Sequence, residues 1–201
     1  MINKYFGNLI TGFTVFLLLT SNVFSTEWGL DSNESQLNFI SVKKNSIAEV
    51  HQFHNLTGDI DQQGHFKLTI DLNSVDTNIA IRDERMREFL FQTAKFTQAT
   101  VTADIDSATI SAIPIGGSIV LNLDAKLELH GESKPLELAL LVVRLGDEKL
   151  LVINNKPIIL NVADFALVAG VDKLQKLAKL PSISHAIPVS FVLVFTEYNE
   201  I

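Results

Sequence analysis

The sequence of 201 residues contains no cysteine, and this absence excludes several classes of protein. Without cysteine there is no disulfide framework, no thiol nucleophile and no acylated cysteine of the lipoprotein kind. Basic residues are also scarce, since 16 Lys and Arg stand against 23 Asp and Glu, a formal net charge of −7. Binding to a phosphate backbone requires a basic surface, so we expect no nucleic acid partner.

Motifs for common catalytic chemistry are missing as well. The sequence has no G-x-S-x-G nucleophile elbow, no G-x-G-x-x-G fingerprint and no phosphate-binding loop. His51 and His54, with Asp59 and Asp61 nearby, are the best candidates for a metal site. On a strand, however, a spacing of three places the two histidines on opposite faces. We therefore predict no metal site, no catalytic residue, no cofactor and no enzymatic activity.

Charge is almost missing from residues 1–25, where Lys4 is the only charged side chain. The apolar run from Phe13 to Leu19 is too short to span a bilayer and is typical of the core of a signal peptide. Val23 and Ser25 suit the positions before a cleavage site. Residues 1–25 are therefore predicted to be a signal peptide for export to the periplasm, with an uncleaved membrane anchor as the alternative.

Cleavage before Thr26 would leave 176 residues with a formal charge of −8. A chain of this length is suited to one domain with a substantial core. We therefore expect a single domain over residues 26–201.

An alternation of apolar and polar residues is the main pattern that the sequence does contain. It is strict from Phe66 to Leu72, continues from Ile119 to Leu129 with Val120 as the sole exception, and returns from Ile187 to Phe195. A period of two residues is typical of half-buried strands. Asp61 to Gly64 is predicted to form a hairpin turn that pairs the strand at Phe66 with an antiparallel strand over Ile47 to Phe53.

Helical spacing occurs in two short segments. Met86, Phe89, Leu90 and Ala94 recur on one helical face, and Asp83 is predicted to be the N-cap of that helix. A second helix is expected over residues 171–180, where Pro181 ends it. Its three lysines suit either a solvated face or contact with anionic lipid headgroups: Lys173, Lys176 and Lys179.

About eight strands, mostly connected by hairpins and without a βαβ rhythm, predict an all-β fold closed as an antiparallel barrel. The hydrophobic fraction of 47% and the mean hydropathy of +0.25 require a large interior. That interior is either a dense core or a ligand cavity. The stretch from Pro135 to Leu145 is apolar on both faces, which indicates either complete coverage or a homodimer contact.

The segment SVDTNIAIRDERMREFLFQTAKF, residues 74–96, carries the most specific resemblance. It resembles the YceI-like family, in which a strand ends in Ser-Val-x-Thr and is followed by Arg-Asp, a helix and a phenylalanine-rich turn. From its residues alone, Arg82-Asp83 suits an anion site, a set of local ion pairs or a helix start. The resemblance extends over nearly the whole mature chain.

The resemblance implies an extended eight-stranded lipocalin-like barrel that binds a polyisoprenoid, such as a quinone tail or a polyprenyl chain, in an apolar tunnel. We therefore expect a periplasmic lipid carrier that makes transient contact with a membrane. A filled-core structural or stress-response module and an enzyme acting on an isoprenoid are the alternatives. The residues expected to line the ligand site are Phe39, Phe53, Leu68, Ile70, Met86, Phe89, Leu121, Leu123, Phe191 and Leu193.

Overall fold

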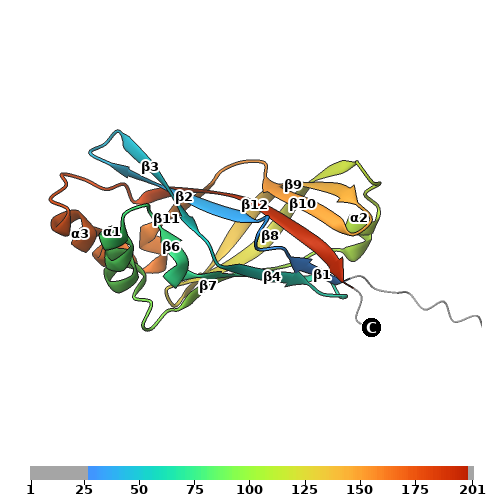
Figure 1. The fold of residues 1–201 in the computed structure, drawn as a ribbon, viewed down its shortest axis with the longest axis horizontal. Coiled ribbons are helices and arrows are strands. Elements are labelled where there is room, and N and C mark those ends of the chain that lie inside the picture. The colour runs from blue at the N-terminus through green and yellow to red at the C-terminus, as the bar shows by residue number, and fades with distance from the viewer. Residues whose placement is uncertain (1–26, 199–201) are drawn as a thin grey trace, which may run out of the picture.

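The computed structural model describes residues 27–198, most of which form one antiparallel sheet (Figure 1). Its strands are β1 (Glu27–Leu30), β2 (Gln36–Lys43), β3 (Ile47–Phe53), β4 (Leu56–Ile60), β5 (His65–Asp71), β6 (Val75–Asp76), β7 (Gln98–Asp104), β8 (Ser118–Leu129), β9 (Glu132–Gly146), β10 (Lys149–Asn154), β11 (Ile158–Asn161) and β12 (Ala186–Tyr198). The helical segments are η1 (Leu72–Ser74), α1 (Ala80–Arg85), the π-helical turn η2 (Met86–Phe91), α2 (Ser107–Ser111), η3 (Val162–Phe165) and α3 (Val168–Leu177). The predicted all-β class with short helical excursions is confirmed. The predicted signal peptide lies outside the described residues.

Eight strands close into a barrel. They are hydrogen-bonded in the order β1-β4-β5-β7-β8-β9-β10-β12, and β12 pairs back with β1, where Trp28 lies opposite Glu197. The first half of β12 pairs with β2 and β11 instead, and β3 and β6 extend the sheet beyond β2. Closure of this kind leaves few unpaired strand edges, which is why an antiparallel sheet of this size curls on itself.

The alternation in the sequence decides which side chains face the interior. On β8, Leu123 and Leu127 are buried, whereas their neighbours Asn122 and Lys126 are exposed. Val120 is 60% exposed, so the one apolar residue that broke the pattern does point outward. The predicted strand from Ile119 to Leu129 is therefore confirmed.

The predicted hairpin at Asp61–Gly64 is present, but the strand before it is β4 rather than β3. Between β3 and β4 the chain breaks at His54 and Asn55, and both backbone N–H groups donate to Ser74. This break lets β3 pair with β2, while β4 pairs with β5. Gly64 is required in the hairpin, because φ is 86° and an added Cβ would lie 1.9 Å from the carbonyl oxygen of Ile105.

The barrel has two different ends (Figure 1). At one end, called here the helical end, α1, η2 and α3 lie beside the β2–β3 hairpin. At the other, called the α2 end, α2 follows β7, and its N-cap is Asp106, whose side chain accepts a hydrogen bond from the N–H of Ala108. Within residues 27–198, no helix is both long enough and apolar enough to cross a membrane.

Candidate functional site

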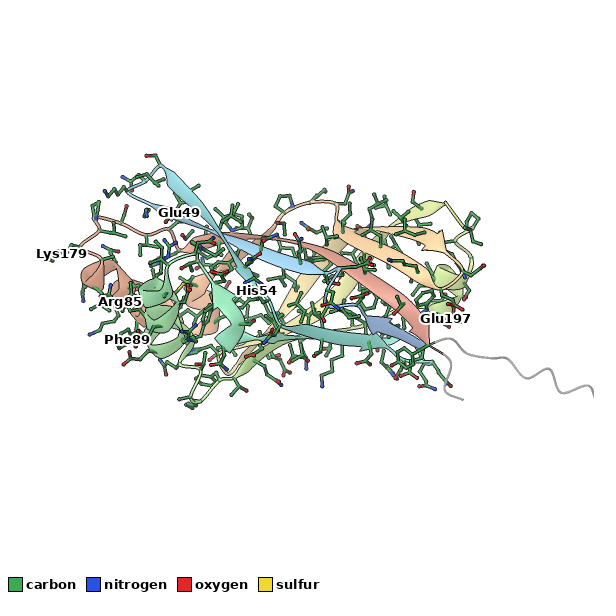
Figure 2. All side chains as sticks on the ribbon, in the orientation of Figure 1. Glu49, His54, Arg85, Phe89, Lys179 and Glu197 are labelled. Atoms are coloured by element: carbon green, nitrogen blue, oxygen red, sulfur yellow. The ribbon has the colours of Figure 1, made fainter. Side chains whose placement is uncertain are left out.

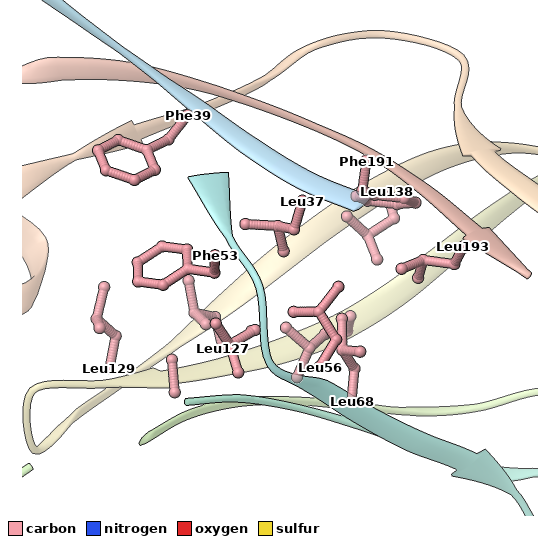
Figure 3. Close-up of a cluster of buried hydrophobic side chains, with 14 of the residues drawn as sticks. Leu37, Phe39, Phe53, Leu56, Leu68, Leu127, Leu129, Leu138, Phe191 and Leu193 are labelled. Carbon is pink, nitrogen blue, oxygen red and sulfur yellow. The ribbon is translucent and has the colours of Figure 1, made fainter. Parts of the chain in front are cut away.

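The barrel encloses a cavity of about 510 Å³. Inward-facing side chains of all the long strands line it, among them Leu68, Leu123 and Phe191. Figure 3 shows leucine and phenylalanine side chains from opposite walls pointing toward one another across the interior. The interior is therefore a cavity with apolar walls rather than a completely filled core.

The cavity opens at the helical end. Of its described lining residues, only Ile79, Ile81, Asn161 and Ala178 are exposed, and all four belong to α1, η3, α3 or the residues beside them. Ile79 and Ile81 are 46% and 51% exposed, respectively. At the α2 end, by contrast, the lining residue Ile110 is only 6% exposed. The exposed part of the described cavity wall thus lies at the helical end, and we call it the mouth.

The structure brings nearly all of the residues predicted to line the site to the cavity wall. Phe89 is the exception. Contact of these residues with a ligand stays a prediction. The residues at the wall are Phe39, Phe53, Leu68, Ile70, Met86, Leu121, Leu123, Phe191 and Leu193.

Phe89 points away from the cavity because η2 is a π-helical turn. An α-helical period would place Met86 and Phe89 on one face, but hydrogen bonding from residue i to i+5 widens the turn. Met86, Leu90 and Phe91 are buried as a result, and Phe89 faces α3. There the Nζ atom of Lys173 lies 5.3 Å from the centroid of the Phe89 ring. The prediction that Phe89 lines the cavity is therefore wrong.

Polar side chains gather at one place on the cavity wall, although every residue predicted from the sequence to line the site is apolar. They come from the β2–β3 hairpin and α1, and Figure 2 shows Glu49 and Arg85 at the helical end. A signal for them was present, since Glu49 and His51 share the strand face of Phe53, which is otherwise apolar. We call this group the polar rim: Ser41, Lys43, Glu49, His51, Arg82 and Arg85.

Arg82 is anchored by two hydrogen bonds from its guanidinium. Nη1 donates to Oε2 of Glu49 at 2.8 Å, and Nη2 donates to the backbone oxygen of Thr77 at 2.6 Å. The same Oε2 accepts from Nζ of Lys43 at 2.7 Å. The hydrogen bond from Lys43, together with the charge of Arg82, holds the pKa of Glu49 below its usual value despite the opposing effect of burial. Arg82 is therefore ion-paired, but its partner is Glu49 on β3 rather than a neighbour in the Arg82-Asp83 segment.

Asp83 is not the N-cap of the helix, as the sequence had predicted. The N-cap of α1 is Ile79, which has no side chain able to accept a hydrogen bond. Asp83 lies in the first turn, where its Oδ1 accepts from both the backbone N–H and the hydroxyl of Thr77. The carboxylate thus holds the chain entering α1 in place of a cap, which positions Arg82 at the mouth.

His51 on β3 and His54, just after the end of that strand, face opposite sides, as their spacing predicted. His51 is 3% exposed and lines the cavity, with its Nε2 2.7 Å from the hydroxyl oxygen of Ser41. His54 is exposed and its Nε2 lies 2.9 Å from Oδ2 of Asp76. Burial, reinforced by the charge of Arg82, lowers the pKa of His51, so this imidazole is neutral at pH 7. Residues 27–198 contain no cluster of three His, Asp or Glu side chains able to hold a metal ion.

Comparison with known proteins places this fold in a family. The sequence model of the YceI-like domain matches residues 28–195. A polyisoprenoid binding domain from Saccharophagus degradans, implicated in plant cell wall breakdown, is 40% identical, with a TM-score of 0.83 over 84% of this chain and 97% of that one. BcnA of Burkholderia cenocepacia shares the fold at 19% identity, with a TM-score of 0.64 over 82% of this chain and 98% of that one. A search of curated proteins gave no match. The closed barrel, its apolar cavity and the match over residues 28–195 lead to one conclusion: the chain belongs to the YceI-like domain family.

Proposed function

We propose that the protein binds the hydrocarbon chain of a long polyisoprenoid lipid in its cavity and carries it. The observation that supports this is a cavity with apolar walls whose exposed lining residues lie at one end, which suits a long flexible chain. Each buried methylene contributes about 0.8 kcal/mol, so several isoprene units would bind tightly without a polar contact. The polyisoprenoid binding domain from Saccharophagus degradans, at 40% identity, supports the same ligand class.

We propose binding rather than catalysis. An enzyme acting on the isoprenoid would need polar side chains at the depth of the cavity where the reacting bond lies. Among the described lining residues, the polar rim and Asn161 lie at the helical end, and the deeper wall is apolar. This distribution favours a carrier over an enzyme.

Native mass spectrometry of the purified mature protein, followed by organic extraction and lipid identification, tests the proposal. We expect a stoichiometric isoprenoid, or uptake of an added long-chain quinone or polyprenol. A protein that is isolated empty and takes up neither lipid would contradict the proposal and favour a structural module without ligand.

Export to the periplasm belongs to the same proposal, because a free lipid carrier is useful between two membranes. The evidence for it is the signal-like sequence of residues 1–25. N-terminal sequencing of the mature protein from a periplasmic fraction should begin at Thr26. Recovery of an uncleaved chain with the membranes would contradict export of a free protein.

The mouth is also the surface that we propose touches a membrane during loading. Ile79 and Ile81 expose apolar side chains there. Lys173 and Lys176 on α3, and Lys179 just after it, are exposed at the same end. Apolar tips flanked by basic residues suit an anionic bilayer. In flotation with vesicles containing phosphatidylglycerol, Ile81→Asp should weaken binding, whereas Ile115→Asp at the α2 end should not. Equal binding of both variants would contradict this orientation.

The outer face of β8, β9, β10 and β12 is the surface that we propose pairs two copies. Val120, Leu141, Ile153 and Val192 lie opposite one another in register across the four strands, and Val120 is 60% exposed. A row without charges can meet its own copy across a two-fold axis without repulsion. Gel filtration should show a dimer that Val120→Asp converts to a monomer and that Asn122→Asp does not. A wild-type monomer at all concentrations would contradict the pairing.

A further inference from the structure

Two buried nitrogen atoms of the polar rim have no hydrogen-bond partner within the described part of the chain: Nδ1 of His51 and Nε of Arg82. Both side chains line the cavity at its mouth. Leaving a buried polar atom unpaired is unfavourable, and native proteins do so at few positions. Two such atoms on one stretch of a cavity wall indicate a place that receives a polar group of a ligand.

Nε of Arg82 indicates whether the polar group of the ligand is a hydrogen-bond donor or an acceptor. The other guanidinium nitrogens are held by Glu49 and Thr77, so the plane of the guanidinium is fixed before any ligand arrives. An arginine N–H donates and never accepts. The partner of Nε must therefore be an acceptor, and an oxygen atom is the usual one.

His51 fits the same requirement. Its ring is neutral, so one of its nitrogens carries a proton and the other does not. The hydroxyl of Ser41, 2.7 Å from Nε2, can donate to that nitrogen and leave the proton on Nδ1. The ring is held against Phe39, with 5.1 Å between the ring centroids. His51 can thus present a second fixed N–H to the ligand.

The charges of the polar rim limit which head groups can bind there. Lys43, Arg82 and Arg85 are cationic, and Glu49 is the only carboxylate of the rim. A cationic head group, such as an amine, would be repelled by this excess of positive charge. A neutral carbonyl or an anionic oxygen would not.

We propose that the mouth holds the polar head group of the isoprenoid, which presents an oxygen acceptor, a quinone carbonyl or a phosphate oxygen, to Nε of Arg82 and Nδ1 of His51. This inference rests on the proposed function. It also orients the lipid, with the head group at the mouth and the end of the chain toward α2.

The test compares three probes on the purified protein stripped of lipid: a long-tailed quinone, a polyprenyl monophosphate, and squalene, which has no head group. Dissociation constants are measured for the wild type, His51→Phe and Arg82→Lys. His51→Phe keeps a ring beside Phe39 but removes both nitrogens, and Arg82→Lys keeps the charge near Glu49 but removes the Nε donor. For a probe with the correct head group, each variant should weaken binding about tenfold, the effect of one buried hydrogen bond. Squalene binding should not change.

His54→Phe is the matched control. It makes the same change three residues further along the chain, just after β3, but His54 faces outward toward Asp76 and does not line the cavity. We expect wild-type affinity of this variant for all three probes.

The possible results distinguish a failure of the head-group site from a failure of lipid binding itself. If the two variants lose affinity only for the quinone, the acceptor is a carbonyl oxygen. If they lose affinity only for the monophosphate, the acceptor is a phosphate oxygen. Wild-type affinity of His51→Phe and Arg82→Lys for every probe would overturn the head-group site while leaving lipid binding intact. A wild type that binds none of the three probes would overturn the proposed function itself. If Arg82→Lys does not fold, His51→Phe decides alone.

Discussion

The two ends of the barrel are closed by different kinds of side chain. At the α2 end, Ile110 and Ile113 are 6% and 1% exposed and join the apolar core. At the helical end, Ile79 and Ile81 stay about half exposed, and the rim holds partly exposed charges and two buried nitrogens without a partner among the described residues. The α2 end is therefore packed like the interior of an ordinary protein, whereas the helical end keeps exposed apolar side chains and polar groups without partners in the described part of the chain.

This difference between the two ends indicates which of them is suited to binding. An unpaired buried polar group costs about 1–3 kcal/mol, so a chain selected only for stability would remove it. The α2 end carries no such group on its cavity wall within residues 27–198, whereas the mouth carries two. Stability is therefore concentrated at one end and binding chemistry at the other, and each of the following experiments tests that division.

The largest effect on lipid uptake is expected from a substitution in the cavity wall, between the two ends of the barrel. Leu123 is 8% exposed and lines the cavity, so Leu123→Arg would place a charge in the path of the lipid chain. We expect uptake to fall by at least about 100-fold, which is about 2.7 kcal/mol, the contribution of roughly three to four buried methylene groups of the lipid. Lipid content after extraction, measured by mass spectrometry, checks this. Asn122→Arg, which points outward from the same strand, is the control, and retained lipid in a folded Leu123→Arg would refute the lining assignment.

The α2 end should respond as a packed core. Ile113→Ala removes a side chain that is 1% exposed, and the free energy of unfolding should fall by about 2–5 kcal/mol. Ile115→Ala, two residues away and 59% exposed, should change it by no more than about 0.5 kcal/mol. Urea denaturation measures both. Similar small values for the two variants would show that this end is not closed by tight packing.

The mouth depends on a close contact between α3 and η2. An added Cβ at Gly170 would lie 2.7 Å from the backbone oxygen of Phe89 and 2.8 Å from Cα of Leu90. Gly170→Ala should therefore push α3 outward and destabilise the fold by about 1–3 kcal/mol, with faster hydrogen exchange in α3. Gly146→Ala, where the new methyl group meets open space, is the control. Unchanged exchange in α3 would contradict the close contact.

The smallest effect concerns the ion pairs of the rim. Because the pKa of Glu49 is lowered in the folded state, its ionised form stabilises the fold at neutral pH. That stabilisation is lost as the pH falls through the lowered pKa. Glu49→Gln should therefore cost about 0.5–1 kcal/mol at neutral pH, a value reduced for partial solvent exposure. Denaturation at a series of decreasing pH values should show the difference from wild type shrinking, and a constant difference would contradict this.

Predictions from the sequence succeeded where the pattern was local. The strands at Phe66 and Ile119 alternate with a period of two, and this alternation alone places Leu68 and Leu123 inside. The prediction for Phe89 failed because the helix widens to a π-helical turn, which single-residue spacing does not reveal. The pairing of β5 with β4 was missed because a two-residue break divides the strand before the hairpin.

By itself, the sequence determined the all-β class, the faces of the strands and the family, since these follow from a local period of two and from the Arg-Asp segment. Only the tertiary structure decided that the interior is a cavity, that it opens at the helical end, and that His51, Glu49 and Arg82 meet there. The physical reason is that inward-facing apolar residues look alike whether they fill a core or line a tunnel. The distance between opposite walls depends on barrel closure, which joins strands far apart in the chain.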